Sequence, residues 1–435
     1  MAPHAPARAA KNSASNDRPS LLVLDAAYTL EMIRERGLEA SITCRDLDGY
    51  FAHVFSVHPF ATLLTSPEWG TRHGPPQWYR LDERNTVIEG RIGRFGWLAW
   101  LFPVNFLIGQ LGLFVTLLRL IRREKVAVIR VGDPLYLGLF GLALKAFTGK
   151  PMLIRVNGNN DKVRESTGRP LYPRFFRSIA LEQRVERFVL PHADIVAAPN
   201  QDNVDFAVRH GAREARCTIF RYGNLLAPEH RLPPAERGTD EALFTRLGIV
   251  PGRYMLCIGR LQTVKFPDDA VRVLGGVVAA GHEVKLFFAG DGDMREDLTA
   301  LAATLGVADR LVIGGNQDQH ALAQLNAHAA LVLSPLTGRA LSESALGAAP
   351  LVAYDLDWQG DLVRTDETGE LVPFRDVAAL TRAAARMLDD PQRARRLGAK
   401  ARERASAMLD PAVLDRHERD TYDRLFAGQL PAPGA

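Results

Sequence analysis

The stretch ALVLSPLTGRALSESALGAAPLVAYD, residues 330–355, contains two short aliphatic runs with a helical pattern between them. The runs at 330–335 and 350–355 are mostly aliphatic, which is typical of strands that are buried on both faces. The segment between them predicts a helix over 341–348. A strand, a helix and a second strand in this order form a parallel pair with the helix packed on the sheet.

The same alternation runs through both halves of the 435-residue chain. Further strands are predicted at 21–26, 126–131, 151–156 and 194–199, and again at 254–259, 283–290 and 310–315. A chain of this length usually forms two domains. We therefore predict an α/β protein with two doubly wound, Rossmann-like domains that face a central cleft. Open parallel sheets bind ligands at the carboxyl ends of their strands.

Composition predicts where the domains begin and end. Residues 1–19 are rich in Ala, Pro, Ser and Asn and lack the apolar core of a signal peptide, so a disordered tail is expected there. A proline- and charge-rich stretch without periodicity predicts a linker at 229–245. The N-terminal domain is then predicted at 20–228 and the C-terminal domain at 246–410. Residues 411–435 are expected to form a helix that packs back on the N-terminal domain, followed by a tail.

Charge and cysteine content exclude several classes of protein. The formal net charge is +4, and the chain has no zinc-finger spacing and no long basic run, so nucleic acid is not an expected partner. The three cysteines, Cys44, Cys217 and Cys257, are far apart and odd in number. They predict neither a disulfide framework nor a metal site, and they favour a reducing, cytoplasmic location.

Residues 97–118 form an uncharged stretch flanked by Arg91, Arg94, Arg119, Arg122 and Arg123. It has about the ~20 residues that a membrane-spanning helix needs. However, it contains Pro, Asn, Gln and Gly and leads directly into the strand predicted at 126–131, which is ordinary α/β connectivity. We expect a buried or monotopic helix, with peripheral contact between residues 97–123 and an anionic membrane as a hypothesis. An integral membrane protein is the alternative.

The stretch IGRLQTVKF, residues 258–266, places two cations after a predicted strand. Gly259 permits close approach to the backbone, Arg260 offers a planar fork for phosphate oxygens, and Lys265 adds a second charge. A pyrophosphate fits this pair. The motif alone is weak, and a solvated surface loop explains it equally well.

Two glycine-containing turns follow other strands of the same half. The Gly-Asp-Gly turn at 290–292 suits a ligand that lies on bare backbone, although a plain tight turn is an equal alternative. Gly338 and Arg339 begin a helix whose N-terminal N–H groups can bind an anion. Glu343, one turn later, can accept hydrogen bonds from sugar hydroxyls or can simply stabilise the helix dipole.

Together these motifs resemble the retaining glycosyltransferases of the GT-B fold that are grouped as family 4, or glycosyltransferases group 1. The resemblance covers about residues 250–425 and rests on the order GRL-x3-K, AGDG, G-x3-D-x2-AL-x2-L and E-x6-P-x-VAYD. It implies that Arg260 and Lys265 hold the donor diphosphate and that Glu343 binds the ribose; these three form the implied catalytic set. The implied donor contacts are Gly259, Gly290, Asp291, Gly292, Gly338, Arg339, Ala340 and Leu341.

The sequence departs from the family at one position. Family members usually carry a glutamate eight residues before the position of Glu343, and here that residue is Pro335. The missing carboxylate usually touches the transferred sugar, so its absence leaves the identity of that sugar open. The diphosphate site is not affected by this change.

The N-terminal half is expected to bind the acceptor. The loop after strand 151–156 contains Asn157, Gly158, Asn159 and Asp161, which bind hydroxyls well but are also the usual residues of loops. The segment 44–64 mixes charged residues, His53 and His58 with aromatic residues, as sugar-binding surfaces do, and either histidine is as readily a core residue. Gly223 and Asn224 are predicted to lie near the nucleotide.

The resemblance implies a hexosyl-type glycosyltransferase (EC 2.4) that uses a nucleoside-diphosphate sugar and a glycan or lipid-linked acceptor, in cell-surface glycan, polysaccharide or glycolipid synthesis. No cofactor is implied, and no metal is required if the two cations and a helix N-terminus neutralise the leaving diphosphate. A catalytically impaired nucleotide-sugar-binding protein of the same fold is the alternative. A dinucleotide oxidoreductase is not favoured, because the first strand is not followed by a G-x-G-x-x-G motif.

Overall fold

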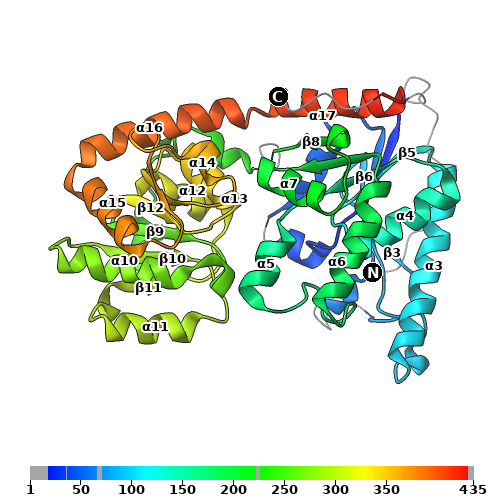
Figure 1. Ribbon diagram of the computed structural model, residues 1–435, viewed down its shortest axis with the longest axis horizontal. Helices are drawn as coiled ribbons and strands as arrows, with labels where there is room; N and C mark the ends of the chain where they lie inside the picture. Colours follow the sequence, from blue (N-terminus) through cyan, green and yellow to red (C-terminus); the bar gives the residue numbers. More distant parts are fainter. Residues whose placement is uncertain (1–17, 36, 66–70, 222–225, 430–435) are drawn as a thin grey trace.

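The computed structural model describes residues 18–35, 37–65, 71–221 and 226–429. They form two α/β domains that lie side by side, each built on a sheet with helices on both faces (Figure 1). The predicted fold class, two Rossmann-like domains, is confirmed.

The N-terminal domain contains an eight-stranded sheet of order β3-β4-β2-β1-β5-β6-β7-β8. All neighbouring strands are parallel except β3 and β4, which are antiparallel. The strands are β1 (Ser20–Leu24), β2 (His53–His58), β3 (Gln77–Arg80), β4 (Asn85–Glu89), β5 (Val126–Val131), β6 (Met152–Arg155), β7 (Ile195–Ala198) and β8 (Cys217–Ile219). The helices are α1 (Leu30–Glu35), α2 (Glu39–Thr43), α3 (Phe102–Arg123), α4 (Tyr136–Thr148), α5 (Asn160–Thr167), α6 (Ile179–Val189) and α7 (Gln201–Arg209).

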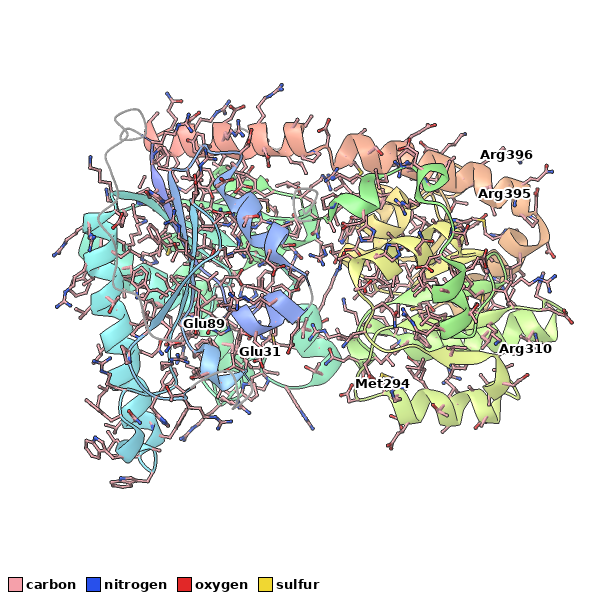
Figure 2. All side chains as sticks on the ribbon, turned by 180° about the vertical axis from the view of Figure 1, so that it is seen from behind. Glu31, Glu89, Met294, Arg310, Arg395 and Arg396 are labelled. Atoms are coloured by element: carbon pink, nitrogen blue, oxygen red, sulfur yellow. The ribbon has the colours of Figure 1, made fainter. Side chains whose placement is uncertain are left out.

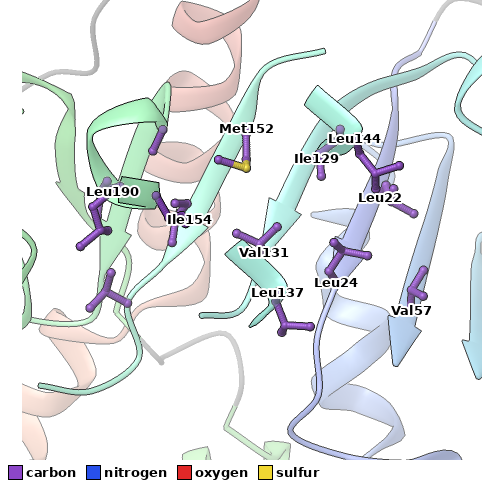
Figure 3. Close-up of a cluster of buried hydrophobic side chains, with 14 of the residues drawn as sticks. Leu22, Leu24, Val57, Ile129, Val131, Leu137, Leu144, Met152, Ile154 and Leu190 are labelled. Carbon is purple, nitrogen blue, oxygen red and sulfur yellow. The ribbon is translucent and has the colours of Figure 1, made fainter. Parts of the chain in front are cut away.

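The core of this domain is built from alternating residues of the central strands. Leu22 and Leu24 of β1 face the same cluster as Ile129 and Val131 of β5, and all four side chains are fully buried (Figure 3). The intervening residues of β1 belong to a second cluster on the other face of the sheet. Burial on both faces explains why these strands read as continuous aliphatic runs.

The C-terminal domain contains a six-stranded, all-parallel sheet of order β11-β10-β9-β12-β13-β14. Its strands are β9 (Tyr254–Ile258), β10 (Lys285–Ala289), β11 (Leu311–Ile313), β12 (Leu331–Ser334), β13 (Leu351–Asp355) and β14 (Glu370–Pro373). Its helices are α9 (Glu241–Leu247), α10 (Pro267–Ala279), α11 (Arg295–Thr304), α12 (Gln319–His328), α13 (Arg339–Leu346), α14 (Gln359–Leu362), α15 (Val377–Asp389) and α16 (Pro391–Met408). The order reverses direction at β9 and β12, so the loops after these strands lie at the switch point where ligands usually bind.

The chain crosses between the domains twice. The segment after β8 includes the short helix α8 (Pro234–Arg237) and lies against the C-terminal domain, where the ring of buried His230 contacts Gln319 (Nε2 to Oε1, 2.9 Å). Helix α17 (Pro411–Phe426) returns to the N-terminal domain and continues the line of α16 along one side of the molecule (Figure 1). Glu418 of α17 forms a buried ion pair with Arg130 of β5, Oε1 to Nη1 2.8 Å.

Candidate active site

Two loops of the C-terminal domain lie in contact at the carboxyl ends of β9 and β10. Gly259 and Gly290 have φ angles of 149° and 157°, which favour glycine. A Cβ atom at Gly290 would lie 2.0 Å from the carbonyl oxygen of Gly259, and one at Gly292 would lie 2.4 Å from that of Leu261. Glycine is therefore required in the 290–292 turn so that the loop carrying Arg260 can pack against it.

The side chain of Asp291 points away from this contact. It is about half exposed and pairs with Arg295, the first residue of α11, Oδ1 to Nε 3.0 Å. Its backbone carbonyl, by contrast, accepts a hydrogen bond from the N–H of Leu261 (3.1 Å). Asp291 thus joins the two loops through its main chain, and its predicted donor contact remains a prediction.

Arg260 and Lys265 are the two cations predicted to bind a diphosphate. Arg260 is exposed and Lys265 is partly buried, and neither side chain has a hydrogen-bond or ion-pair partner among the described residues. Burial and the neighbouring Arg260 guanidinium lower the pKa of Lys265. Two adjacent cations whose side chains are not hydrogen-bonded form a site that an anion would stabilise.

Helix α13 begins beside Lys265. Its N-cap, Gly338, has φ 64° and ψ −128°, and no side chain caps the helix. A Cβ atom at Gly338 would lie 3.7 Å from Lys265 Nζ. The N–H groups of Arg339 and Ala340 have no partner within the described part of the chain. The amine of Lys265 and the free N–H groups of α13 therefore point to one anion site.

Glu343 lies inside α13, and only 3% of its surface is exposed. Its Oε1 lies 3.3 Å from Nε of Arg339. The structure therefore brings together Gly259, Arg260, Lys265, Gly338 and this carboxylate from two separate segments. It supports the arrangement that the motifs predicted, although the roles of the individual residues stay predictions.

Pro335 occupies the loop between β12 and α13, and it is buried. The side chain of Gln359 holds this loop: Nε2 donates to the carbonyls of Ser334 (3.1 Å) and Pro335 (3.3 Å). Its Oε1 accepts from the hydroxyl of Ser334 (2.5 Å). The loop is therefore held by the side-chain amide of Gln359, and it has no carboxylate at position 335.

Asp357, which was not predicted from the sequence, supplies a carboxylate close to Lys265. Its backbone has a φ of 58°, and its Oδ1 atom is buried without a hydrogen-bond partner among the described residues. Burial and the negative charge of Asp202 raise its pKa to about 6, opposed by Lys162 and Lys265. Since Lys162 and Asp202 belong to the other domain, Asp357 lies where the two domains meet.

Helix α5 of the N-terminal domain contacts the turn carrying Lys265. Asn159 caps this helix by accepting from the N–H of Lys162, and its amide donates to Asp202 (Nδ2 to Oδ2, 3.0 Å). Lys162 pairs with the same carboxylate, Nζ to Oδ1 2.8 Å. Asn157 donates to the carbonyl of Gly132 (3.1 Å). The predicted loop thus faces the C-terminal domain, with its amides already hydrogen-bonded.

Asp161 takes part in a buried ion-pair cluster. His210 Nε2 lies 2.8 Å from its Oδ2, and Arg164 Nη1 lies 3.2 Å from its Oδ1. Arg164 also pairs with Glu186, Nη2 to Oε1 2.7 Å. The carboxylates and the imidazole lie close enough to hold a metal ion. The Arg164 guanidinium already supplies the positive charge between the two carboxylates, so the residues present do not require a metal.

Two carboxylates of the N-terminal domain were also missed. Asp25 follows β1 and pairs with Arg45, and Asp133 follows β5. Burial raises the pKa of Asp133 to about 7, against hydrogen bonds from the N–H of Leu135 and the hydroxyl of Tyr172. Asp25 directly follows β1, and Asp133 follows β5 after Gly132; this place after a strand is a signal in the sequence, but one that many loop aspartates share.

The histidines of segment 44–64 lie in β2. His58 is buried, 2% exposed, and burial lowers its pKa to about 4; His53 is exposed. His58 therefore serves as a neutral core residue in this structure. Gly223 and Asn224 lie outside the described residues.

The sequence of residues 241–404 matches the protein family described as Glycosyl transferases group 1. The match lies over the C-terminal domain. The family that the motifs suggested is thereby confirmed, and the matched region contains every predicted donor residue of the glycosyl transferase domain.

Relatives with similar sequences include glycosyltransferases of actinobacteria. D-inositol 3-phosphate glycosyltransferase of Nocardia farcinica is 29% identical over 215 residues, which are 45% of this chain and 48% of the relative. Alpha-D-kanosaminyltransferase of Streptomyces kanamyceticus is 27% identical over 160 residues, 36% of this chain and 42% of the relative. The chain thus matches about half the length of these relatives or less.

Solved structures match nearly the whole chain. Sucrose-phosphate synthase from Thermosynechococcus elongatus has a TM-score of 0.70 over 95% of this chain and 100% of that one, at 17% identity. HepE from Anabaena, solved with UDP and glucose, has a TM-score of 0.66 over 93% of this chain and 100% of that one, also at 17% identity. At these identities the likeness shows the fold, and the predicted GT-B arrangement of two facing domains is confirmed.

Proposed function

We propose that this protein is a glycosyltransferase that moves a sugar from a nucleoside-diphosphate sugar to a hydroxyl acceptor, with retention at the anomeric carbon. The observation that carries the proposal is the anion site formed by Arg260, Lys265 and the uncapped start of α13 at Gly338. The buried Glu343 lies one helical turn beyond these groups. A nucleoside diphosphate fits this arrangement. Its phosphates would lie between the two cations, and its ribose would lie against the Glu343 carboxylate.

The chemical contribution of this site is charge neutralisation. Cleavage of the bond between the anomeric carbon and the β-phosphate leaves a nucleoside diphosphate with one more negative charge. Arg260, Lys265 and the free N–H groups of α13 stabilise that developing charge, and they are in place before the reaction. The acceptor would approach from α5 and the carboxyl end of β5, where Asp133 could accept or share a proton near neutral pH.

The proposed acceptor is a glycan or lipid-linked hydroxyl compound in cell-surface glycan, polysaccharide or glycolipid synthesis. A polar acceptor suits the amide and carboxylate groups of Asn157, Asn159 and Asp133 on this side. One relative named above, D-inositol 3-phosphate glycosyltransferase, has a polyhydroxylated molecule in its name, which supports a hydroxyl acceptor without defining it.

The test measures ligand binding by thermal shift with UDP, GDP, ADP and NAD. We expect one nucleoside diphosphate to raise the melting temperature of the wild type and to have no effect on Arg260→Ala/Lys265→Ala. The control is Arg395→Ala/Arg396→Ala, which removes two exposed arginines of α16 that lie far from the N-terminal domain (Figure 2). Shifts that are equal in all three proteins would reject the donor site. Turnover of the matching nucleotide sugar, with the product anomer assigned by NMR, would then test transfer and retention.

A catalytically impaired nucleotide-sugar-binding protein is the second candidate, because Pro335 replaces the expected carboxylate. It would bind the same nucleoside diphosphate. It would release no sugar from the matching nucleotide sugar with any acceptor, including water.

A further inference from the structure

The N-terminal domain has a large apolar surface on α3, on the turn before it and on the end of α4. In the turn, Trp97 and Trp100 are 74% and 78% exposed, more than any other large hydrophobic side chain that the structure describes. Leu107 and Leu111 on α3 are 59% and 55% exposed, and Phe147 at the end of α4 is 67% exposed. We call this surface the apolar patch. Its members are Phe95, Trp97, Trp100, Phe102, Val104, Leu107, Leu111, Val115 and Phe147.

The polarity of α3 is the reverse of what a helix on a water-exposed surface normally shows. The polar residues Asn105 and Gln110 face the protein and are 1% and 6% exposed. Gln110 donates to the carbonyl of Pro59 (3.0 Å) and accepts from the hydroxyl of Tyr136 (2.8 Å). Two of the polar residues that weakened the sequence prediction of a spanning helix, Asn105 and Gln110, are therefore turned inward, and valine and leucine are turned outward.

The turn that carries the tryptophans is fixed to α3. Asn105 Oδ1 accepts hydrogen bonds from the N–H groups of Arg94 (2.8 Å) and Phe95 (3.0 Å), and its amide donates to the carbonyl of Phe95 (2.7 Å). A Cβ atom at Gly93 would lie 2.6 Å from Asn105 Nδ2, so the backbone passes directly over this side chain. The Asn105 side chain thus fixes the backbone just before the tryptophans, whose two large rings are exposed to water.

Basic residues lie at both ends of the apolar patch. Residues 91–125 contain six basic residues and one acidic residue, Glu124, which pairs with Arg123 (Oε1 to Nε, 3.3 Å). Arg94 is exposed at one end, and Arg119 and Arg122 are exposed at the other. A second copy of the chain would bring these like charges together in a two-fold interface. Anionic lipid headgroups complement them.

The helix is long enough to cross a membrane but is anchored in the domain. The segment Phe102–Arg123 is the one helix among the described residues with the length and composition of a span, at a mean hydropathy of 1.8. Its inner face, with Leu113, Leu117 and Leu120, is part of the core over β5. It forms the edge of the N-terminal domain that is remote from the C-terminal domain (Figure 1). Only its outer face is free to meet lipid.

We propose that the apolar patch docks this protein onto the surface of an anionic lipid bilayer, with α3 lying in the plane of the membrane interface. Trp97 and Trp100 enter the boundary between headgroups and acyl chains, where tryptophan is favoured. The arginines at the two ends contact anionic headgroups. The inference does not depend on the proposed glycosyltransferase activity.

The experiment is flotation of the full-length protein with vesicles of phosphatidylcholine, with and without phosphatidylglycerol. We expect the wild type to float with the anionic vesicles at low salt. Trp97→Ser/Trp100→Ser should weaken partitioning by at least tenfold (~0.8 kcal/mol per buried CH₂). Arg119→Gln/Arg122→Gln/Arg123→Gln should weaken it on the order of a hundredfold, at ~1 kcal/mol per arginine near the surface.

Two controls keep the result specific. Phe188→Ser removes an apolar side chain of α6 that is 53% exposed and lies outside the patch, and it should float like the wild type. Tryptophan emission of the wild type should shift to shorter wavelength with anionic vesicles, and the shift should vanish in the double tryptophan variant. Flotation that is equal in all variants would overturn the proposal. A wild type that stays with the soluble fraction, or a dimer that the tryptophan variant abolishes, would overturn it as well.

Discussion

Gly338 lies directly beside Lys265: a Cβ atom added to the glycine would be 3.7 Å from Nζ of the lysine. The two residues are 73 positions apart in the sequence and come from the loops after β9 and β12. The start of α13 can therefore share one ligand with the lysine only if the backbone at 338 keeps its conformation. That conformation, φ 64° and ψ −128°, is one that residues with a Cβ atom rarely adopt.

We therefore predict that Gly338→Ala damages both stability and ligand binding. The strained backbone should lower the free energy of unfolding by about 1–3 kcal/mol, measured by urea denaturation. Nucleoside diphosphate affinity, measured by calorimetry, should fall as well, because the N–H groups of α13 are displaced. Gly158→Ala is the control, since that glycine has open space around its Cβ position and no left-handed φ. If the affinity of Gly338→Ala for the nucleoside diphosphate were unchanged, the start of α13 would not be part of the binding site.

Glu343 gives a prediction that distinguishes ribose binding from helix stabilisation. If its carboxylate accepts ribose hydroxyls, Glu343→Gln should weaken nucleoside diphosphate binding by about ten- to a hundredfold, the effect of a hydrogen bond to a charged group (~1.5–3 kcal/mol). Binding of inorganic pyrophosphate should not change, because it has no ribose. The matched control is Glu296→Gln, an exposed carboxylate in the first turn of α11. Equal losses for both ligands would assign Glu343 to positioning Arg339 instead.

The strands of the central sheet were predictable because burial on both faces leaves a continuous aliphatic run. The predicted runs at 126–131, 254–259 and 350–355 correspond to β5, β9 and β13 within one residue. Strands that the runs did not reveal include β3, whose exposed residues Gln77 and Arg80 have no aliphatic pattern, and β14, which is only four residues long. An edge strand forms because it pairs with a neighbouring strand of the folded sheet. A short sequence pattern does not reveal that pairing.

The donor residues could be predicted because each glycine and cation has a fixed place after a strand. Asp357 and Asp133 could not be singled out in the same way. An aspartate in a loop is ordinary, and only the folded chain brings Asp357 next to Lys265 and, across the domain boundary, Lys162. Burial, which raises the pKa values of both carboxyl groups, is likewise a property of the packed structure.

The return of α17 to the N-terminal domain gives a third prediction. Glu418→Ala would leave Arg130, whose side chain is 11% exposed, without its buried partner. Removing one member of a buried ion pair costs about 3–5 kcal/mol, so the melting temperature should fall clearly. Asp420→Ala, an exposed carboxylate of the same helix, is the control and should have little effect. A small effect from both variants would mean that α17 contributes little to the stability of the domain.

Asp357 gives a prediction with a defined pH dependence. Its pKa is about 6 in the folded protein, against a usual value of 3.8, so the folded state binds more protons than the unfolded state between about pH 4 and 6. Its contribution to stability is therefore favourable below this window and is lost as the pH rises through it. Asp357→Asn removes the buried charge and should raise the free energy of unfolding at pH 7.5 by about 1–3 kcal/mol. The gain should shrink steadily as the pH is lowered towards 5.

The same residue connects pH with ligand binding. A diphosphate on Lys265 adds negative charge near the Asp357 carboxylate, so binding should weaken as the pH rises and Asp357 loses its proton. In Asp357→Asn this part of the pH dependence should disappear, whereas Asp355→Asn, an exposed aspartate at the end of β13, should retain it. Calorimetric titrations with nucleoside diphosphate across pH 5 to 8 would measure the effect. If Asp357→Asn kept the wild-type profile, the carboxylate would lie too far from the bound diphosphate to interact with it, and its raised pKa would reflect only burial and the charge of Asp202.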